Sequence, residues 1–204
     1  MKKYIVLAAV VVLAMAISNA SAGMWWQRGD PGSTWQDWTF DTGVNPATPE
    51  AYSNPGIPQA SIVAKPGSHV PEAGWKDGWY GREGVWAGDI LQITLDIPNV
   101  PPPNTFKEIW LQMEYIGDVT ATSIIIPQSG VEFLGGGWDY STEGWKIYTV
   151  GWRIFPNPVE EQIFVEIVNS GAFLNYLYVD TICVPEPATL ALLGLGALVL
   201  RKRS

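Results

Sequence analysis

The sequence predicts an all-β fold for the central part of the chain. Every second side chain is apolar from Leu91 to Ile97, with a mostly polar set between them, and the same holds from Ile109 to Tyr115. An alternation with a period of two is typical of a strand that buries one of its faces. Between residues 23 and 183 no stretch sustains the apolar period of a helix, and glycine and proline separate the alternating segments. We therefore expect a two-sheet antiparallel β-sandwich that is jelly-roll-like.

Further strands are expected along the rest of this region. They are predicted at residues 34–40, 60–65, 84–87, 119–126, 131–134, 144–155, 162–169 and 174–184. Few other strand signals occur in residues 41–79, which are rich in proline and glycine. We expect this stretch to form a long loop over the sandwich, and long loops of this kind often carry function.

A removable export signal is predicted at residues 1–22. Lys2 and Lys3 precede an uninterrupted apolar run at residues 4–17, and Ala20-Ser21-Ala22 supplies the small residues that signal peptidase reads. As a helix this run would extend over about 21 Å, which is short of the roughly 30 Å hydrocarbon core of a bilayer. A signal helix that is cleaved after Ala22 therefore fits better than a permanent anchor. The β-sandwich domain would then occupy residues 23–183.

The end of the chain, residues 184–204, has three distinct parts. It begins with a proline-flanked carboxylate, made by Pro185, Glu186 and Pro187. An almost wholly apolar run follows at residues 188–200, and the chain closes with the basic residues Arg201, Lys202 and Arg203. Prolines do not fit the interior of a helix, and a basic end stays on the cytoplasmic side of a membrane. The apolar run would make only about 20 Å of helix, so we expect a short hydrophobic helix that anchors the chain transiently.

This arrangement resembles the PEP-CTERM domain of Gram-negative bacteria that make extracellular polysaccharide. The segment VPEPATLALLGLGALVLRKRS at residues 184–204 matches the whole pattern of motif, short apolar helix and basic tail. The resemblance implies recognition by an exosortase, a membrane protease-transpeptidase that removes the tail near the Pro-Glu-Pro motif. The chain would be held in the inner membrane before processing and would afterwards lie at the cell envelope, at the surface or outside the cell.

A weaker resemblance concerns the last predicted strand. Residues 177–184 are similar to the closing strand of galactose-binding-like jelly-roll carbohydrate-binding domains, which often carry two adjacent aspartates between apolar residues. Asp180 matches the first of these, whereas Thr181 stands at the second. The resemblance implies a carbohydrate-binding sandwich.

The charge balance excludes one class of partner. Residues 23–187 contain all twenty acidic side chains but only seven of the twelve basic ones, which gives this region a formal charge of −13. Nucleic-acid binding needs basic patches, so we expect no nucleic-acid partner. Cys183 is the only cysteine, so no intramolecular disulfide holds the fold. We expect this thiol to be an inert residue at the end of a strand, and an intermolecular bridge is the alternative.

Tryptophan is the most unusual feature of the composition. All eleven tryptophans lie between Trp25 and Trp152, and five of them follow a glycine. Indole faces can stack on sugar rings while the N–H donates a hydrogen bond. The densest aromatic group lies in residues 74–86, and its candidate glycan-stacking residues are Trp75, Trp79, Tyr80 and Trp86. The alternative is that these rings anchor a loop to the core.

Little in the sequence points to catalysis. His69 is the only histidine and no Gly-x-Ser-x-Gly motif accompanies it, so we predict no catalytic residues and no enzyme activity. One histidine and one cysteine do not suffice for a zinc site. Calcium is the one candidate cofactor, because several aspartates fall near predicted strand ends, where oxygen ligands can converge. These are Asp37, Asp41, Asp139 and Asp180, and ordinary turn or surface acids are the alternative.

These observations predict an exported, non-enzymatic protein of the cell envelope or extracellular matrix. Its expected partners are signal peptidase, an exosortase-like membrane protease and an extracellular polysaccharide. Two alternatives remain at this point. One is a secreted hydrolase that acts on glycans, which would need two carboxylates facing one sugar bond. The other is a purely structural matrix protein without a ligand.

Overall fold

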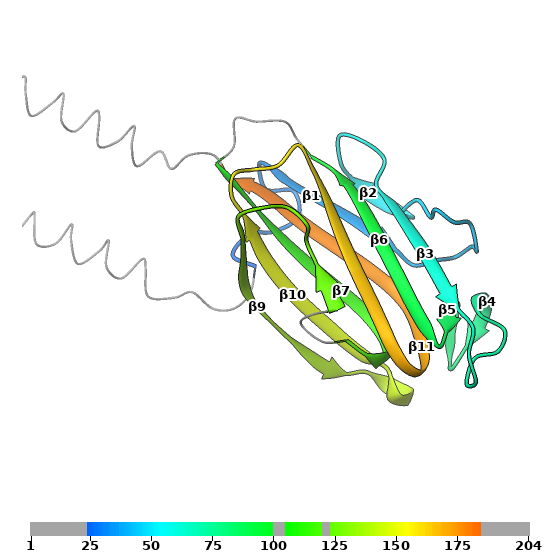
Figure 1. Ribbon diagram of the computed structural model, residues 1–204. Coiled ribbons are helices and arrows are strands. Elements are labelled where there is room, and N and C mark those ends of the chain that lie inside the picture. Colours follow the sequence, from blue (N-terminus) through cyan, green and yellow to red (C-terminus); the bar gives the residue numbers. More distant parts are fainter. Residues whose placement is uncertain (1–23, 100–104, 120–122, 185–204) are drawn as a thin grey trace, which may run out of the picture.

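A computed structural model describes residues 24–99, 105–119 and 123–184 of the 204-residue chain. Antiparallel strands make up one 11-stranded sheet in this part of the protein (Figure 1). The expected signal helix at residues 1–22 and the expected hydrophobic helix after the Pro-Glu-Pro motif lie outside the described residues. Among the residues that are described, no α-helix occurs, and no helix is long and apolar enough to cross a membrane.

The described part of the chain forms eleven strands. They are β1 (Ser33–Trp38), β2 (Ala51–Ser53), β3 (Gln59–Lys65), β4 (Gly74–Trp79), β5 (Arg82–Gly88), β6 (Ile90–Pro98), β7 (Phe106–Asp118), β8 (Ile124–Ile125), β9 (Val131–Tyr140), β10 (Lys146–Ile154) and β11 (Glu160–Val184). A short 3-10 helix, η2 (Thr142–Gly144), connects β9 to β10.

The strand β11 is 25 residues long and takes part in both layers of the fold. Its first half pairs with β6 and β8, and β3 extends this layer beyond β6. Its second half lies between β1 and β7 in the order β2-β1-β11-β7-β10-β9. The register of β11 shifts between Val168 and Phe173, where Gly171 has a φ of 102° that favours glycine. The sheet therefore curls at this bend and packs against itself.

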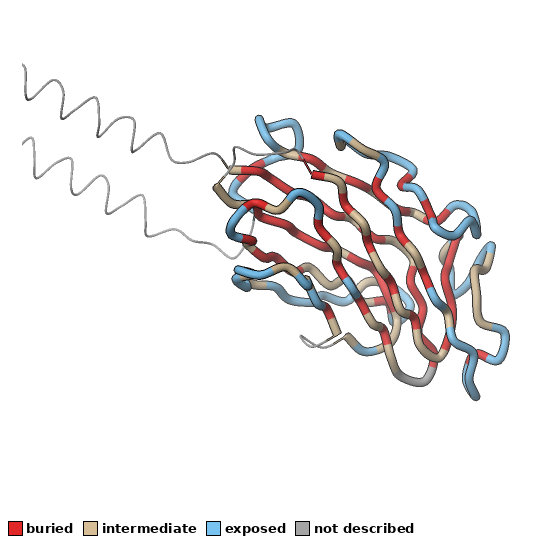
Figure 2. Tube along the Cα trace, turned by 45° about the horizontal axis from the view of Figure 1, so that its top comes forward, coloured by how far each residue is buried: buried red, intermediate tan, exposed pale blue. Residues whose placement is uncertain are grey.

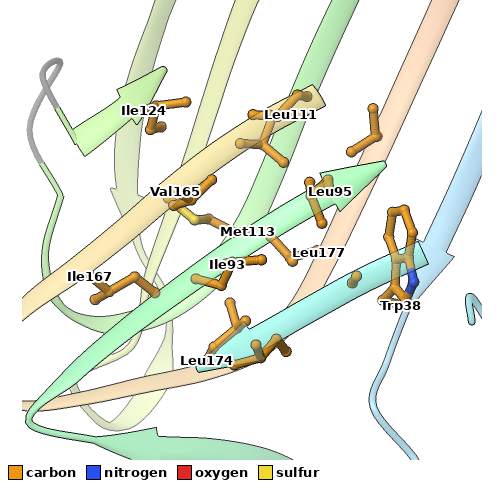
Figure 3. Packing of buried hydrophobic residues seen from close by; sticks show 14 of the residues in the cluster. Trp38, Ile93, Leu95, Leu111, Met113, Ile124, Val165, Ile167, Leu174 and Leu177 are labelled. Atoms are coloured by element: carbon orange, nitrogen blue, oxygen red, sulfur yellow. The ribbon is translucent and has the colours of Figure 1, made fainter. Parts of the chain in front are cut away.

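The core fills the space between the two layers. Burial alternates along the strands, as the red and paler segments of Figure 2 show. Leu111, Met113 and Leu177 come from one layer and are fully buried. They meet Ile93 and Val165 from the other layer within a single cluster (Figure 3). Such inward side chains from two facing layers are what holds a disulfide-free β fold together.

The structure confirms the all-β, antiparallel prediction. Both alternating segments form strands, β6 and β7, and the predicted segments at residues 162–169 and 174–184 are joined in the one long strand β11. Because β11 is shared, the two layers belong to one continuous sheet instead of two separate sheets. The jelly-roll topology stays a prediction.

The loop expected at residues 41–79 is wrong in part. Besides β3, which was expected, this stretch contains β2 and also β4, which forms a hairpin with β5. The turn of this hairpin is Tyr80-Gly81, and both residues have positive φ, as a type I′ turn requires. A tyrosine at the first of these positions is not among the usual turn signals, which are Asn-Gly and Asp-Gly.

The buried core leads to a prediction about the free energy of unfolding. Leu177→Ala removes a fully buried side chain from the middle of β11, so we expect a loss of about 2–5 kcal/mol in the free energy of unfolding, measured with urea. Val63→Ala in β3 is the control, because Val63 is 55% exposed and should lose less than about 1 kcal/mol. Equal losses in the two variants would contradict this assignment of the core.

Candidate functional site

The long strand β7 separates two ends of the molecule. At one end Phe106 pairs with Val184, the first residue of the predicted sorting tail. At the other end Tyr115 pairs with Lys146, where β10 begins. Between Phe106 and Tyr115 a strand extends over about 30 Å. We call the end of the molecule at Phe106 the proximal end. We call the end at Tyr115 the distal end, and it includes the β4–β5 turn and the β9–β10 connection (Figure 1).

The four predicted glycan-stacking residues divide into two pairs. Trp75 and Trp86 face each other across β4 and β5 and pack against the core, with Trp86 only 6% exposed. The indole N–H of Trp75 donates to the carbonyl of Phe40 at 2.8 Å. Trp86 is therefore buried and Trp75 is partly buried against the core, so for these two candidates the structure favours the alternative that they anchor the segment to the core. Hairpin pairing causes this, because directly opposed residues point to the same side of a sheet.

Trp79 and Tyr80 remain exposed at the distal end. They lie at the β4–β5 turn and are 44% and 56% exposed. The Trp79 ring stacks on Phe173 with a centroid distance of 6.1 Å, and the Tyr80 ring meets Phe173 edge-on at 5.4 Å. Phe173 is itself buried in β11, so it fixes the two exposed rings to the sheet. The structure thus brings together two of the four predicted aromatic residues.

A second aromatic pair at the distal end lines a pocket of about 250 Å³. Trp138 and Tyr140 on β9 are 58% and 69% exposed, and their rings meet edge-on at 4.9 Å. They pair with Tyr148 and Lys146 of β10, so they lie on the core-facing side of the sheet. Since β9 is the last strand in the order of this layer, these rings lie at the margin of the core and contact solvent. No pattern in the sequence singles out either residue as part of a site, although three glycines precede Trp138.

Polar groups complete the lining of this pocket, which we call the distal pocket. Besides Trp138 and Tyr140 it is lined by Tyr115, Asp118, Val119 and Lys146. The Lys146 ammonium donates to the carbonyl of Gly117 at 2.8 Å and lies 3.4 Å from the Asp118 carboxylate. Burial, with smaller contributions from Tyr148 and Asp118, raises the pKa of Tyr115 to about 12. The Tyr115 hydroxyl therefore stays protonated at neutral pH and is able to donate a hydrogen bond.

Arg82 holds the two connections of the distal end together. Its guanidinium makes two 2.9 Å hydrogen bonds to Glu114 on β7. The same group also donates to the hydroxyls of Ser141 and Thr142 in the β9–β10 connection. In the opposite direction the buried Trp145 donates its indole N–H to the Tyr80 carbonyl at 3.0 Å. These hydrogen bonds fix the β4–β5 turn and the β9–β10 connection relative to each other, and both exposed aromatic pairs lie on or next to these two segments.

The four candidate calcium ligands do not gather around one point. Asp37 on β1 and Asp180 on β11 are diagonal neighbours across the two strands, and Arg28 binds both carboxylates at 2.7 and 2.5 Å. Asp41 accepts a hydrogen bond from Thr39 near β1, and Asp139 lies on the far strand β9. Within the described part of the chain, no group of three or more His, Cys, Asp or Glu side chains could hold a metal ion. At the one place where two of the aspartates meet, an arginine supplies the positive charge.

The comparison with protein families identifies the tail. The fold and the charge define an acidic, all-β domain whose last strand leads directly into a terminal segment. Residues 184–204 match the PEP-CTERM protein-sorting motif, with the boundaries that the sequence predicts. The chain is therefore an exported protein that an exosortase membrane protease processes, and its C-terminal segment anchors it transiently in the membrane. No curated protein and no solved structure matches this chain.

The sorting motif can be tested directly. In the variant Pro185-Glu186-Pro187→Ala-Ala-Ala we expect the tail to stay attached, because the exosortase recognises this motif. Intact mass spectrometry of the chain from the native host would show the mass of the tail retained in this variant and absent in the wild type. Normal removal of the tail from the variant would contradict the role of these three residues.

The pair of Arg82 and Glu114 predicts a pH dependence of stability. Burial acts to raise the pKa of Glu114, but hydrogen bonds from Arg82, Ser141 and Asn175 outweigh it and lower this pKa below its usual 4.5. The stabilisation is thus present above that usual value and is lost as the pH falls through the lowered value. Arg82→Ala leaves a buried carboxylate without its cation, and we expect a loss of about 3 kcal/mol at pH 7.

The pH series also supplies the test of this pair. The difference between wild type and Arg82→Ala should shrink at acidic pH, below the lowered pKa of Glu114, where this carboxyl group is protonated in both proteins. Urea unfolding at the two pH values measures it. Lys76→Ala is the control, since the ion pair of Lys76 with the exposed Glu72 has a 4.0 Å separation and should contribute less than about 1 kcal/mol. A difference that stays constant with pH would refute the assignment.

Proposed function

We propose that this protein is a non-enzymatic component of the cell envelope or extracellular matrix that binds extracellular polysaccharide at its distal end. The distal pocket is the observation on which the proposal rests. It combines two exposed aromatic rings with an ammonium, a carboxylate and a phenol hydroxyl. A monomeric protein gains nothing in stability from exposing such rings, so rings that line a pocket indicate a ligand.

The chemistry of the pocket suits a sugar. The apolar C–H face of a sugar ring can pack on the faces of Trp138 or Tyr140, which exclude water from it. Hydroxyl groups at the edge of the sugar then need donors and acceptors. The Lys146 ammonium and the Tyr115 hydroxyl offer donors, and the indole N–H of Trp138 offers another. Small polar groups around aromatic walls are the usual composition of a site for a polar ring.

The exposed turn aromatics extend the candidate surface. Trp79 and Tyr80 lie on the β4–β5 turn, which Arg82 and Trp145 link to the β9–β10 connection. A polymer of many sugar units can contact more than one aromatic group, and several weak contacts on one chain add up in affinity. This supports a polymeric ligand over a single free sugar.

The position of the sorting tail also supports a ligand site at the distal end. The tail begins at Val184 at the proximal end, about 30 Å along β7 from the distal pocket. Whatever joins the processed chain to the envelope is attached near the proximal end. The distal end would then face away from that attachment, toward the matrix outside the cell.

The distal pocket favours binding over hydrolysis. A glycoside hydrolase needs two carboxyl groups on either side of the scissile bond. Of the described residues that line this pocket, Asp118 alone is acidic, and it lies next to the ammonium of Lys146. A purely structural role would instead leave Trp138 and Tyr140 without consequence for any glycan, which an experiment can decide.

Replacement of Trp138 tests the proposed function. We expect Trp138→Ala to weaken binding to an extracellular polysaccharide by about tenfold, the equivalent of roughly 1.4 kcal/mol from one aromatic contact. Affinity electrophoresis through gels that contain each member of a panel of neutral and acidic bacterial polysaccharides would measure this. Tyr140→Ala should act in the same direction.

The strand β9 itself provides a matched control. Phe133 is 62% exposed and lies on the same face of β9, but toward its other end, opposite Trp152. Phe133→Ala should therefore leave binding unchanged while it removes a similar exposed aromatic area. If the wild type binds no polysaccharide of the panel, or if Trp138→Ala binds as well as Phe133→Ala, the proposal is wrong.

A further inference from the structure

The proximal end contains a fully buried ion pair. The Lys107 ammonium lies 2.7 Å from the Glu161 carboxylate, and neither side chain is exposed at all. Lys107 stands on the inward face of β7 beside Ile154, and Glu161 stands in β11 opposite Ile97. A lysine is almost never completely buried, because its ammonium loses its hydration there. The desolvation of this buried ion pair costs free energy, so we expect its surroundings to give the pair a specific role.

A buried asparagine side chain lies against this pair. The Lys107 nitrogen is 3.1 Å from the side-chain oxygen Oδ1 of Asn99, which directly follows β6. The thiol of Cys183 also donates to this oxygen at 3.1 Å. On its other side the Asn99 amide nitrogen donates to the side-chain oxygen of Asn157 at 2.9 Å and to the carbonyl of Pro158. The amide is thus fixed in orientation, and its carbonyl faces two donors.

The surroundings favour the neutral form of the Glu161 carboxyl group. Burial raises the pKa of Glu161, and the attraction of Lys107 opposes this only in part. The second carboxyl oxygen of Glu161 has no hydrogen-bond partner among the described residues. A dry site in which a carboxylate is incompletely solvated promotes transfer of a proton from ammonium to carboxylate. The product is a neutral primary amine, which is a nucleophile, next to the carbonyl of an oriented amide.

We propose that Lys107 and Asn99 form an intramolecular isopeptide bond, with Glu161 as the group that accepts and returns the proton. The three side chains come from β7, from the end of β6 and from β11, so folding of the sheet is what brings them together. Reactive groups that are held in contact in this way have effective concentrations far above those in solution.

The reaction balances without any further reagent. Glu161 first takes a proton from the Lys107 ammonium, and the neutral amine attacks the side-chain carbonyl carbon Cγ of Asn99. A bond between the Lys107 nitrogen and Cγ forms, while the Cys183 thiol donates to the oxygen and stabilises its negative charge. The bond from Cγ to the amide nitrogen then breaks. Glu161 returns its proton to that nitrogen, which leaves as ammonia. The Lys107 nitrogen loses one further proton as the new amide forms, and the departing ammonia takes it up.

The released ammonia has a path out of the core. Asn99 and Glu161 both line a second pocket of about 250 Å³, together with the exposed residues Ile57 and Val159. The bond would join the end of β6 to the start of β7 by a covalent link. It lies beside Cys183, one residue before the matched sorting motif. The cross-link would therefore reinforce the place where the domain continues into its anchoring tail.

Mass spectrometry of the wild-type chain tests this proposal. We expect the denatured protein to contain a peptide with both Asn99 and Lys107 that is lighter by one ammonia, about 17 Da. Trypsin should also fail to cleave after Lys107, because the modified side chain no longer carries a charge. A wild-type peptide of unmodified mass, or normal cleavage after Lys107, would overturn the proposal.

Two variants distinguish the cross-link from other losses of ammonia. An asparagine can also lose ammonia by closing a ring with its own backbone, and this would not depend on Lys107. Lys107→Arg keeps the positive charge but removes the nucleophilic amine, so the mass of the Asn99 peptide should be unmodified. Glu161→Gln removes the proton acceptor and should have the same effect. A loss of about 17 Da that persists in Lys107→Arg would refute the isopeptide bond, whether or not the variant folds as stably as the wild type.

Discussion

The pairing of the long strand β11 is the constraint on which the rest of the structure depends. This one strand pairs with β1, β5, β6, β7 and β8, so it is the common member of both layers. Its inward residues, among them Val165 and Leu177, face each other across the core after the bend near Gly171. A strand that curls back over itself needs no disulfide to join the layers, because the chain itself is the connection. That is consistent with a single cysteine in an exported protein.

The same strands give the molecule two chemically different ends. At the proximal end, β7 and β11 place Lys107 and Glu161 inside the core, where water is excluded. At the distal end, β7 supplies Tyr115 and Glu114, which support a pocket and a pair of turns at the surface. The two ends differ in burial. A polar group deep between the layers contacts only other protein groups, whereas exposed groups at the margin of the sheet can contact a ligand. The sorting motif begins at the first end, which is why the proposed ligand site lies at the second.

The sequence predicted the parts of this structure that depend on local pattern, and it missed those that depend on strand order. Alternation is local, so β6 and β7 were found correctly. Exposure of Trp138 is not local, because it follows from the position of β9 at the margin of a sheet. Adjacent Gly-Trp pairs likewise cannot reveal that Trp75 packs against the core while Trp79, next to the turn of the hairpin, stays exposed. One signal was present, since Lys107 shares its parity along β7 with Ile109 and Leu111, which places a charge on the buried face.

The charge of the domain bears on the kind of polymer that the distal end would bind. Most of its few basic side chains already pair with acids across strands, as Arg28 does with Asp37 and Asp180 and Arg82 with Glu114. The acids that remain make the field around the domain negative, which repels a polyanion beyond the reach of any one cation. Lys146 is the cation of the distal pocket, and Asp118 lies 3.4 Å from it and largely balances it. An uncharged polysaccharide meets neither penalty, so electrostatics favours neutral sugar units at the aromatic rings over a strongly acidic polymer.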